Sequence, residues 1–438
     1  MIVWQDLSKV QQTELLARPA ISNKQALTGI VSDLIQRVQS EGDQALLSLT
    51  EQFDGIQLEE VALPNELKQA SLRNLSNDAK AAIDLAYNNI KTFHQAQQSQ
   101  DIKVETMPGV ECQLLTRAIK SVGLYIPGGT APLPSTVLML GVPAQIAGCE
   151  RVVLCTPPDS SEGNYASVTA EILYAAELCG IKEIYRVGGA QAISAMAYGT
   201  ETIAKVDKIF GPGNSFVTEA KQQVNNDANG AVIDMPAGPS EVLVIADKDA
   251  NPVFIAADLL SQAEHGADSQ VFLVTDSESI INQTKLELEQ QLQLLPRADI
   301  ARKALANSSL ILTNSLSQSI EVSNLYAPEH LIVQTQDAER LLPKLDNAAS
   351  IFLGAYTPES AGDYASGTNH VLPTYGYSKT LSSLSLADFT RKFTVQTVNK
   401  QGMKHIGPAI MTLAAAEGLD AHKNAVKVRM DTLTRGQE

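Results

Sequence analysis

Cysteine is scarce in this sequence, which holds four of them in 438 residues and no CxxC pair. So small a number argues against a framework of disulfides. We interpret Cys149, Cys155 and Cys179 as small core residues, because each lies in an apolar stretch. The N-terminal sequence turns polar after four residues and does not resemble a signal peptide. We therefore expect a soluble, cytoplasmic protein without disulfides.

Long hydrophobic runs and positive charge are also lacking. The longest apolar run, residues 137–148, contains Pro143 and Gln145 and is too short to cross a bilayer. Lys and Arg number 33 against 49 Asp and Glu, which gives a net charge of −16. Because nucleic-acid binding requires a basic stripe and membrane spanning requires a long apolar run, we expect neither nucleic acid nor a membrane as a partner. The sequence contains no low-complexity segment and no repeat of roughly 20–50 residues.

What the sequence does contain is an alternation of strands, glycine-containing loops and helices, which is typical of α/β folds with parallel sheets. Its 44% of hydrophobic residues can form a sizeable core, and its length suffices for two or three domains. The alternation predicts two α/β units, at residues 121–239 and 240–384. The expected strands are 122–126, 151–155, 183–187 and 206–210 in the first unit, and 241–246, 270–275, 309–313, 331–334 and 350–354 in the second.

Outside the two units the patterns are mostly helical. Residues 1–20 are interpreted as a polar lead-in, and the apolar spacing predicts helices within 23–53 and 64–98. Two alternating runs around Pro108 and Gly109 predict a hairpin. The tail is expected to form a strand at 394–399 and helices at 408–417 and 420–433.

Four of the six histidines lie in short motifs rich in glycine, proline and acidic residues. Gln262 and His265 stand three residues apart in a helix that we expect to end at a left-handed Gly266, so they share one face and could form half of a metal site. Asp363 and His422 complete the candidate set, whose two imidazoles and two oxygens suit zinc, manganese or cobalt. The alternatives are structural: a turn cap for Asp363, an exposed helix turn for His422, and a solvated or core imidazole for His265.

Glu329 and His330 follow Pro328 and precede the apolar run 331–333. We expect this pair at the mouth of a parallel strand, where α/β sheets bind ligands. His330 is a candidate general base near neutral pH, and Glu329 could orient it or activate a water molecule. The alternative is a solvated pair in a loop, with no part in chemistry.

Two glycine loops, Gly188-Gly-Ala-Gln191 and Gly211-Pro-Gly-Asn214, each join a strand to the start of a helix. Amide groups at such a position attract phosphate. Neither loop has the GxGxxG spacing of the ordinary dinucleotide site, so tight-turn glycines are as good an interpretation as a phosphate cradle. Tyr125 could stack on a flat ring or simply fill the end of a sheet.

Together these motifs resemble the histidinol dehydrogenase family over nearly the whole chain. Several motifs in the right order are far more specific than any one of them. The loop 159–165 belongs to none of them and is interpreted as a surface insertion. The stretches that carry the resemblance are Val122-Gly-Leu-Tyr-Ile-Pro-Gly-Gly, Val187-Gly-Gly-Ala-Gln-Ala-Ile, Lys208-Ile-Phe-Gly-Pro-Gly-Asn, Asp234-Met-Pro-Ala-Gly-Pro-Ser-Glu, Leu260-Ser-Gln-Ala-Glu-His-Gly, Pro328-Glu-His-Leu, Pro358-Glu-Ser-Ala-Gly-Asp-Tyr-Ala-Ser-Gly-Thr-Asn-His and Ala414-Ala-Ala-Glu-Gly-Leu-Asp-Ala-His.

The resemblance implies a zinc-dependent, NAD-linked oxidation of L-histidinol through L-histidinaldehyde to L-histidine, the final steps of histidine biosynthesis. The implied zinc ligands are Gln262, His265, Asp363 and His422. The implied catalytic acid–base pair is Glu329 and His330. Substrate contacts are implied at Ser240, His370 and Glu417, as well as at the zinc ligands and His330. NAD contacts are implied at Tyr125, Gln191 and Asn214.

The resemblance also implies an α/β architecture of aldehyde-dehydrogenase type, with two Rossmann-like parallel-sheet domains plus small N-terminal and C-terminal dimerisation segments. The implied parts are an N-terminal segment 1–20, a discontinuous catalytic domain 21–124 and 240–384, an NAD-binding domain 125–239, and a tail 385–438. Members of the family are intertwined homodimers, so the tail is expected to pack on the partner subunit. Glu417 and His422 would then complete the partner's site.

Two alternatives remain at this point. A zinc hydrolase could use the same ligands with Glu329 as base and His330 as acid, but it has no need of the loops near Tyr125, Gln191 and Asn214. A non-enzymatic zinc-binding protein of the same fold would be expected to have lost at least one motif, and none is lost. Formation of NADH distinguishes the dehydrogenase from both.

Overall fold

The computed structural model describes residues 1–18, 24–128, 133–159, 167–236 and 238–435. The chain divides into two units, residues 1–97 with 119–389 and residues 98–118 with 390–438. Most of the loop 159–165, from residue 160 onward, lies outside the described residues.

One sheet of the first unit has five parallel strands in the order β6-β5-β4-β7-β8. The strands are β4 (Ser121–Tyr125), β5 (Arg151–Thr156), β6 (Glu183–Arg186), β7 (Lys208–Phe210) and β8 (Val232–Ile233). The connecting helices are α6 (Pro134–Ala147), α7 (Ala170–Leu178), α8 (Gly189–Tyr198) and α9 (Ser215–Asn226). The predicted alternation is confirmed here, apart from the two-residue β8, which is too short to leave a pattern in the sequence.

The other sheet has six parallel strands in the order β1-β11-β10-β9-β12-β13. The strands are β1 (Ile2–Val3), β9 (Glu241–Ala246), β10 (Gln270–Thr275), β11 (Ser309–Leu312), β12 (His330–Gln334) and β13 (Ser350–Leu353). The helices are α10 (Pro252–Ala263), α11 (Glu278–Leu292), α12 (Ala298–Ala306), α13 (Leu316–Tyr326) and α14 (Ala338–Leu341). The predicted fold class, α/β with two parallel sheets, is therefore confirmed.

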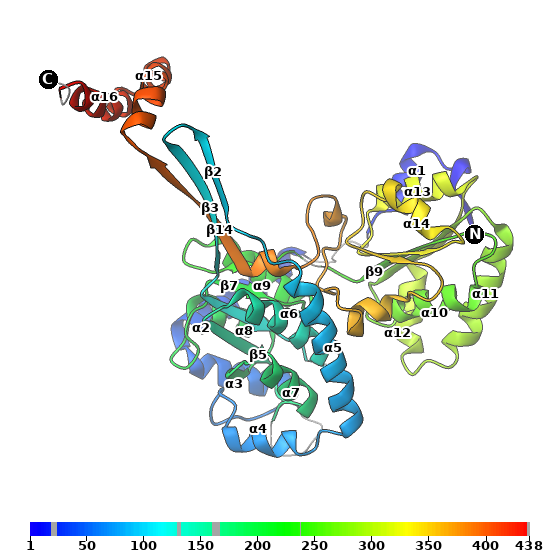
Figure 1. Ribbon diagram of the computed structural model, residues 1–438. Helices are drawn as coiled ribbons and strands as arrows, with labels where there is room; N and C mark the ends of the chain where they lie inside the picture. Colours follow the sequence, from blue (N-terminus) through cyan, green and yellow to red (C-terminus); the bar gives the residue numbers. More distant parts are fainter. Residues whose placement is uncertain (19–23, 129–132, 160–166, 237, 436–438) are drawn as a thin grey trace. The chain divides into compact units, whose positions relative to one another are not determined.

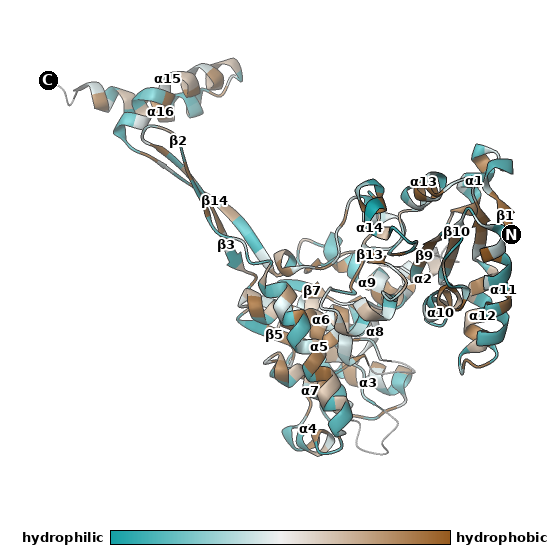
Figure 2. Ribbon diagram, turned by 45° about the vertical axis from the view of Figure 1, so that its right-hand side comes forward, coloured by the Kyte–Doolittle hydropathy of each residue, from teal (hydrophilic) through white to brown (hydrophobic). Residues whose placement is uncertain are grey.

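Strand β9 illustrates why its sequence forms a central strand. All six of its residues are buried, because helices cover both faces of the sheet. Val242 and Val244 face a core that contains α10, α11 and α12, whereas Leu243 and Ile245 face a core that contains α13 and α14. Figure 1 shows these helices on opposite sides of the sheet, and Figure 2 shows β9 and β10 coloured as hydrophobic. Each fully buried Val, Leu or Ile contributes roughly 1.5–3 kcal/mol to folding.

The N-terminal lead-in is more than a polar segment, which corrects the expectation for residues 1–20. Ile2 and Val3 add β1 to the edge of the six-stranded sheet by pairing with Ile311 and Leu312. Helix α1 (Lys9–Leu15) follows, and a capping box formed by Ser8 and Gln11 fixes its start.

Helices α2 (Lys24–Glu41), α3 (Asp43–Asp54), α4 (Asn65–Leu72) and α5 (Asn77–Gln95) confirm the predicted helices of this region. They pack on helices of the five-stranded sheet: α2 and α3 on α8, and α4 and α5 on α7. This packing differs from the expectation that residues 21–124 belong with 240–384. An apolar helix face does not identify, in the sequence, the surface that it covers.

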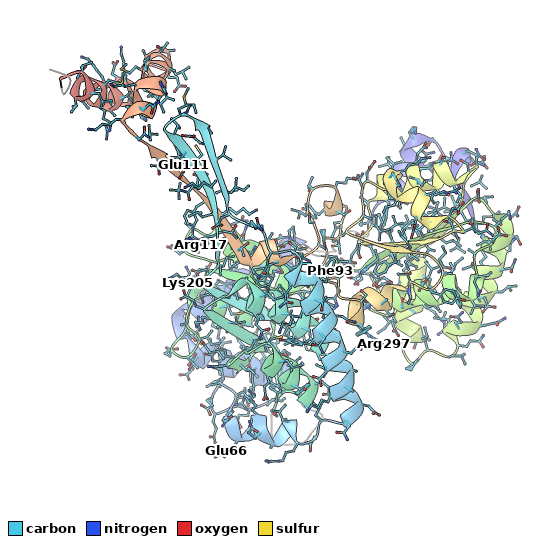
Figure 3. All side chains as sticks on the ribbon, viewed as in Figure 1. Glu66, Phe93, Glu111, Arg117, Lys205 and Arg297 are labelled. Carbon is cyan, nitrogen blue, oxygen red and sulfur yellow. The ribbon has the colours of Figure 1, made fainter. Side chains whose placement is uncertain are left out.

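The second unit contains the three-stranded antiparallel sheet β14-β3-β2 and two helices. Strands β2 (Ile102–Met107) and β3 (Val110–Ala118) form the predicted hairpin, and β14 (Thr390–Val398) pairs with β3 along nine residues. Charged side chains such as Glu111 and Arg117 project from β3 (Figure 3). Helix α15 (Lys400–Ala416) begins before the predicted 408, with Pro408 in its interior, and α16 (Asp420–Arg435) follows.

No helix of the described segments is long and apolar enough to cross a membrane.

Candidate active site

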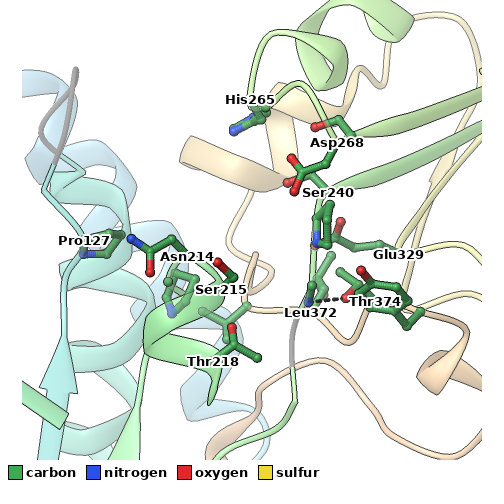
Figure 4. Close-up of a pocket in the computed structure, with 18 of the residues that line it drawn as sticks. Pro127, Asn214, Ser215, Thr218, Ser240, His265, Asp268, Glu329, Leu372 and Thr374 are labelled. Carbon is green, nitrogen blue, oxygen red and sulfur yellow. Dashed lines mark hydrogen bonds between the residues drawn. The ribbon is translucent and has the colours of Figure 1, made fainter. Parts of the chain in front are cut away.

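A cavity of about 840 Å³ in the first unit is lined by segments of both sheets. One wall holds Pro127 and Asn214, which follow β4 and β7, and the other holds Ser240 and Glu329, which precede β9 and β12 (Figure 4). In the five-stranded sheet the cavity therefore lies at the carboxyl ends of strands, as ligand sites in α/β sheets do. In the six-stranded sheet it lies at the amino ends, which corrects the expected position of the Glu329–His330 pair.

The cavity brings together most of the residues expected to form a site. Its lining includes Asn214, Ser240, Gln262, His265, Glu329, His330, Asp363 and His370. These residues come from five separate stretches of sequence, so their meeting is a consequence of the fold. The alternative for Glu329 and His330, a solvated loop pair, is wrong because both side chains are buried.

Glu329 and His330 are held at the amino end of β12 by the main chain of β9. The backbone N–H of Glu241 donates a 2.9 Å hydrogen bond to Oε2 of Glu329, and Nδ1 of His330 lies 3.1 Å from the carbonyl oxygen of Glu241. Gln262 is buried at the end of α10, with Nε2 3.2 Å from Nδ1 of His330. Burial raises the pKa of Glu329, so its carboxylate accepts a proton more readily than an exposed one.

Three carboxyl groups surround the His330 ring. Nδ1 lies 3.5 Å from Glu329 and 3.9 Å from Glu359, and Nε2 lies 3.7 Å from Asp363. Burial alone would lower the pKa of His330, but the charges of Glu359 and Glu329 raise it well above its ordinary value. Burial, together with the charges of Asp363 and Glu329, raises the pKa of Glu359 to about 8. One imidazole thus faces more negative charge than it can balance.

A divalent cation fits this charge pattern. Ligand atoms of His265, Glu359 and Asp363 lie within 4.8 Å of one another. Oε2 of Glu359 and Nε2 of His330 are both buried and have no hydrogen-bond partner among the described residues. Buried polar atoms normally have a partner, and carboxylates with an imidazole form a donor set suited to zinc, manganese or cobalt.

A π-helical turn, Ala361–Ala365, carries Asp363 into the cavity. Such turns are rare and occur often at functional sites. The carbonyl oxygen of Asp363 lies 2.9 Å from Nδ1 of His370, whose Nε2 lies 3.2 Å from the hydroxyl oxygen of Thr136. Burial lowers the pKa of His370, which favours a neutral ring that can donate one hydrogen bond and accept another.

The end of α10 differs from the expectation in one detail. The helix ends at Ala263, and Gly266 does not have a left-handed φ. The backbone N–H of His265 still donates to the carbonyl oxygen of Gln262, at 3.2 Å, so the two residues remain neighbours. His265 is exposed at the cavity, on the same wall as Ser240 and Asp268 (Figure 4).

The three residues expected to contact NAD are not brought together in the cavity. Asn214 lines it, but the Asn214 side chain caps α9 by accepting hydrogen bonds from Phe216 and Val217, both at 3.1 Å. Tyr125 and Gln191 are buried, and the N–H of Gly189 donates to the Tyr125 hydroxyl oxygen at 3.0 Å. The roles of these residues toward NAD stay predictions.

The remaining two predicted residues lie in the second unit. Glu417 follows the end of α15, His422 lies in the first turn of α16, and both are exposed. Leu413 and Leu419 beside them are 64% and 42% exposed, an unusual exposure for leucine at a helix–helix corner.

Glu359 is the site residue that sequence reasoning missed. It stands in the quoted motif that also contains Asp363, four residues earlier. This spacing places two carboxylates on one face of a helical turn, which is the signal that could have identified it.

Known proteins resemble this chain over its full length. The sequence model of the family described as histidinol dehydrogenase matches residues 16–430. The chain belongs to the histidinol dehydrogenase family. Histidinol dehydrogenase of Vibrio parahaemolyticus is 59% identical over 436 residues, 100% of this chain and 99% of that protein. That of Colwellia psychrerythraea is 61% identical over 432 residues, 98% of each chain.

The fold agrees with a solved member of the family. The crystal structure of histidinol dehydrogenase from Elizabethkingia anophelis matches with a TM-score of 0.93 and 50% identity, covering 98% of this chain and 97% of the other. The resemblance inferred from the motifs is thus confirmed. Membership of a family of dehydrogenases also decides against the zinc hydrolase and the non-enzymatic zinc-binding protein.

Proposed function

We propose that this protein oxidises L-histidinol to L-histidine in two successive NAD-linked steps, with L-histidinaldehyde between them. Membership of the histidinol dehydrogenase family supports the substrate and the type of reaction. The observation that carries the proposal is the buried His330 ring beside Glu329, Glu359 and Asp363 in one cavity. Proton transfer needs such a ring, and the surplus of carboxylates needs a cation.

One zinc ion per subunit is proposed, with Gln262, His265, Asp363 and His422 of the partner subunit as ligands. When bound, zinc would hold nitrogen donors of the substrate and balance the buried carboxylates. Because zinc has no accessible redox state, each hydride must pass to a separate acceptor, and NAD is the acceptor proposed. Ser240, His370 and the partner subunit's Glu417 are proposed to contact the substrate.

His330 is proposed as the base of the first step. It would take the proton from the alcohol oxygen while the hydride leaves the adjacent carbon for NAD. A base must be neutral before it acts, and the carboxylates alone hold the pKa of His330 well above its ordinary value. Positive charge beside Asp363 and Glu359 would lower that pKa and free the ring for its role.

Glu329 is proposed to act between the two oxidations. Its Oε2 would accept a proton from the water molecule whose oxygen attacks the aldehyde carbon. The proton that His330 took in the first step would pass to the aldehyde oxygen as the water attacks. The neutral ring would then take a proton from the hydrated aldehyde as the second hydride leaves, and loss of the remaining hydroxyl proton gives the carboxylate of L-histidine. The N–H of Glu241 fixes the Glu329 oxygen, so the base is held in one orientation.

NAD is proposed to bind at the carboxyl ends of the five-stranded sheet, within the proposed domain 125–239, with contacts from Tyr125, Gln191 and Asn214. The position of Asn214 in the cavity wall supports this location for NAD. The four cysteines are free thiols, as is usual in a reducing compartment, and we propose a cytoplasmic location on that ground.

A homodimer is proposed, in which the tail 385–438 of one subunit packs on the other. The exposed Glu417 and His422 and their exposed leucine neighbours support it, because such a surface suits a protein partner.

The test is NADH formation from L-histidinol and NAD by the purified protein, before and after chelation and after return of zinc. Two NADH per histidinol, lost on chelation and restored by zinc, are expected. One NADH per histidinol would contradict the second step and the role of Glu329. No NADH from folded, zinc-loaded protein would overturn the proposal.

A further inference from the structure

The Arg18 side chain, at the end of the N-terminal segment, makes hydrogen bonds, an ion pair and a ring contact with residues of the six-stranded sheet and its helices. Its Nε and Nη2 atoms donate to Oε1 and Oε2 of Glu241 at 3.0 and 2.9 Å. This paired contact fixes the guanidinium plane against the carboxylate plane. The guanidinium carbon lies 3.9 Å from the centroid of the Tyr326 ring. The side chains of Arg18 and Glu241 are 16% and 2% exposed, so this ion pair is shielded from solvent.

Glu241 connects this ion pair to the proposed catalytic residues. Its side chain accepts from Arg18 and, at 2.7 Å, from the N–H of Tyr375. Its N–H donates to Glu329, and its carbonyl oxygen lies 3.1 Å from Nδ1 of His330 and 3.3 Å from Nε2 of Gln262. One residue therefore has its side chain fixed by Arg18 and its main chain fixed against the catalytic pair.

Arg18 also holds the turn that leads into the catalytic pair. Its Nη2 donates to the carbonyl oxygens of Tyr326 and Ala327, at 2.7 and 3.2 Å. Ala327 has a φ of 55°, in the left-handed region that residues with a Cβ rarely adopt. Glu329 and His330 follow two and three residues later. A strained turn keeps its shape only where its surroundings hold it, and Arg18 supplies hydrogen bonds to its carbonyl groups.

We propose that Arg18 is a positioning residue for the proton transfers of this enzyme. Through Glu241 and the Tyr326–Ala327 turn it fixes Glu329 and His330 in one geometry, without touching substrate or metal. Among the described residues it makes no hydrogen bond with Gln262, His265 or Asp363. The inference rests on the proposed roles of Glu329 and His330.

Three variants test this role: Arg18→Ala, Arg18→Lys and Glu241→Gln. For Arg18→Ala we expect kcat for L-histidinol to fall about 100-fold, the scale of a misplacement by about 1 Å. KM and zinc content should stay close to those of the wild-type protein, since Arg18 makes no direct contact with the proposed zinc ligands. Arg18→Lys should recover part of kcat, because lysine keeps the charge but lacks the paired donors.

Because Arg18 and Glu241 form an ion pair, we expect the effects of substituting them to be coupled. Arg18→Ala should cost much less kcat in a Glu241→Gln background than in the wild-type protein, because its main partner is already altered. Additive losses would mean that Arg18 acts without Glu241, and would overturn the route proposed here.

Arg151 offers a matched control in the same protein. Its side chain pairs with both oxygens of Glu183, at 2.7–3.1 Å, and donates to the carbonyl oxygens of Ala204 and Lys205, at 3.0 and 3.2 Å. It thus repeats the paired carboxylate contact and the two carbonyl contacts of Arg18 at the amino end of β5, in the other sheet. Arg151→Ala should lower the unfolding temperature while leaving kcat unchanged.

The outcomes separate the possible failures. A wild-type protein that forms no NADH would overturn the proposed function itself. Active wild-type protein with a fully active Arg18→Ala variant would overturn only the inference about Arg18. A fall in kcat that is matched by loss of zinc, or by an equal fall in Arg151→Ala, would show general destabilisation and would also overturn it.

Discussion

His330 directs its Nε2 atom toward Asp363, with 3.7 Å between that nitrogen and Oδ1. The opposite ring nitrogen, Nδ1, faces Glu329 and Glu359. The ring therefore stands between a carboxylate proposed as a metal ligand and one proposed to activate water.

Glu359→Gln is expected to weaken zinc binding about 10- to 100-fold, the usual effect of removing a group that supports a metal site. The reason is that Glu359 supplies part of the charge that a cation would balance, and its Oε2 has no partner among the described residues. Competition with a coloured chelator measures the affinity without any need for activity. Asp268→Asn removes a charge from the same cavity outside the cluster and should leave the affinity near that of the wild type. Equal affinity in both variants would contradict a role for Glu359 at the metal.

His330→Asn and Glu329→Gln should separate the two oxidations. His330→Asn should slow both steps, because the ring is proposed to take a proton in each, by about 100-fold or more. Glu329→Gln should spare the oxidation of L-histidinol to the aldehyde and slow the oxidation of L-histidinaldehyde. Single-turnover NADH formation from each compound measures the steps separately. Normal oxidation of L-histidinaldehyde by Glu329→Gln would rule out its role in activating water.

The homodimer proposal predicts complementation between two inactive variants. In heterodimers of His265→Asn and His422→Asn, one site would carry both lesions and the other neither, so about half of the wild-type activity should return. Each variant alone should be inactive. Differently tagged subunits allow the heterodimer to be purified before the assay, and an inactive purified heterodimer would place His422 in its own subunit's site.

Asp258→Asn should stabilise the protein above pH 6 and have little effect near pH 4. Asp258 is buried in α10, accepts a 2.7 Å hydrogen bond from Gln334, and has its pKa raised by burial to about 6. The folded chain thus holds this proton more tightly than the unfolded chain, so stability falls as the pH rises from about 4 to about 6 and stays lower above. The variant should gain about 1–2 kcal/mol in unfolding free energy at pH 8. Urea titrations at both pH values measure it, and an equal change at both would refute the titration argument.

Most of the predicted residues that line the cavity could be picked out from the sequence because they occur in short, distinctive stretches. Glu329 and His330 could be predicted from chemistry, since a charged pair before an apolar strand needs an explanation. Glu359 could not be separated from other acidic residues in its motif, because its burial depends on packing that only the fold supplies. The contacts of Arg18 with Glu241 join residues far apart in the chain, and no local pattern records them.

In the fold, too, elements with a local sequence pattern could be predicted, whereas contacts between residues far apart in the chain could not. Apolar segments such as β5 and β9 were predicted with nearly correct bounds. The two-residue β1 could not be predicted, since its pairing with β11 depends on a strand about 300 residues away. The packing of α2–α5 on the helices of the five-stranded sheet was missed for a related reason. An amphipathic face indicates that a helix is covered, but it does not identify the element that covers it.

The three-stranded sheet of the second unit cannot be completed until late in synthesis. Strand β3 is made early, but its neighbour β14 follows only after residues 119–389. At about 5–20 residues per second, the ribosome needs on the order of tens of seconds to supply it. During that time the β2–β3 hairpin presents an open edge of unpaired backbone groups, the feature by which nascent chains recruit one another. All residues of the first unit are therefore synthesised before β14 exists to cover the open edge of the hairpin.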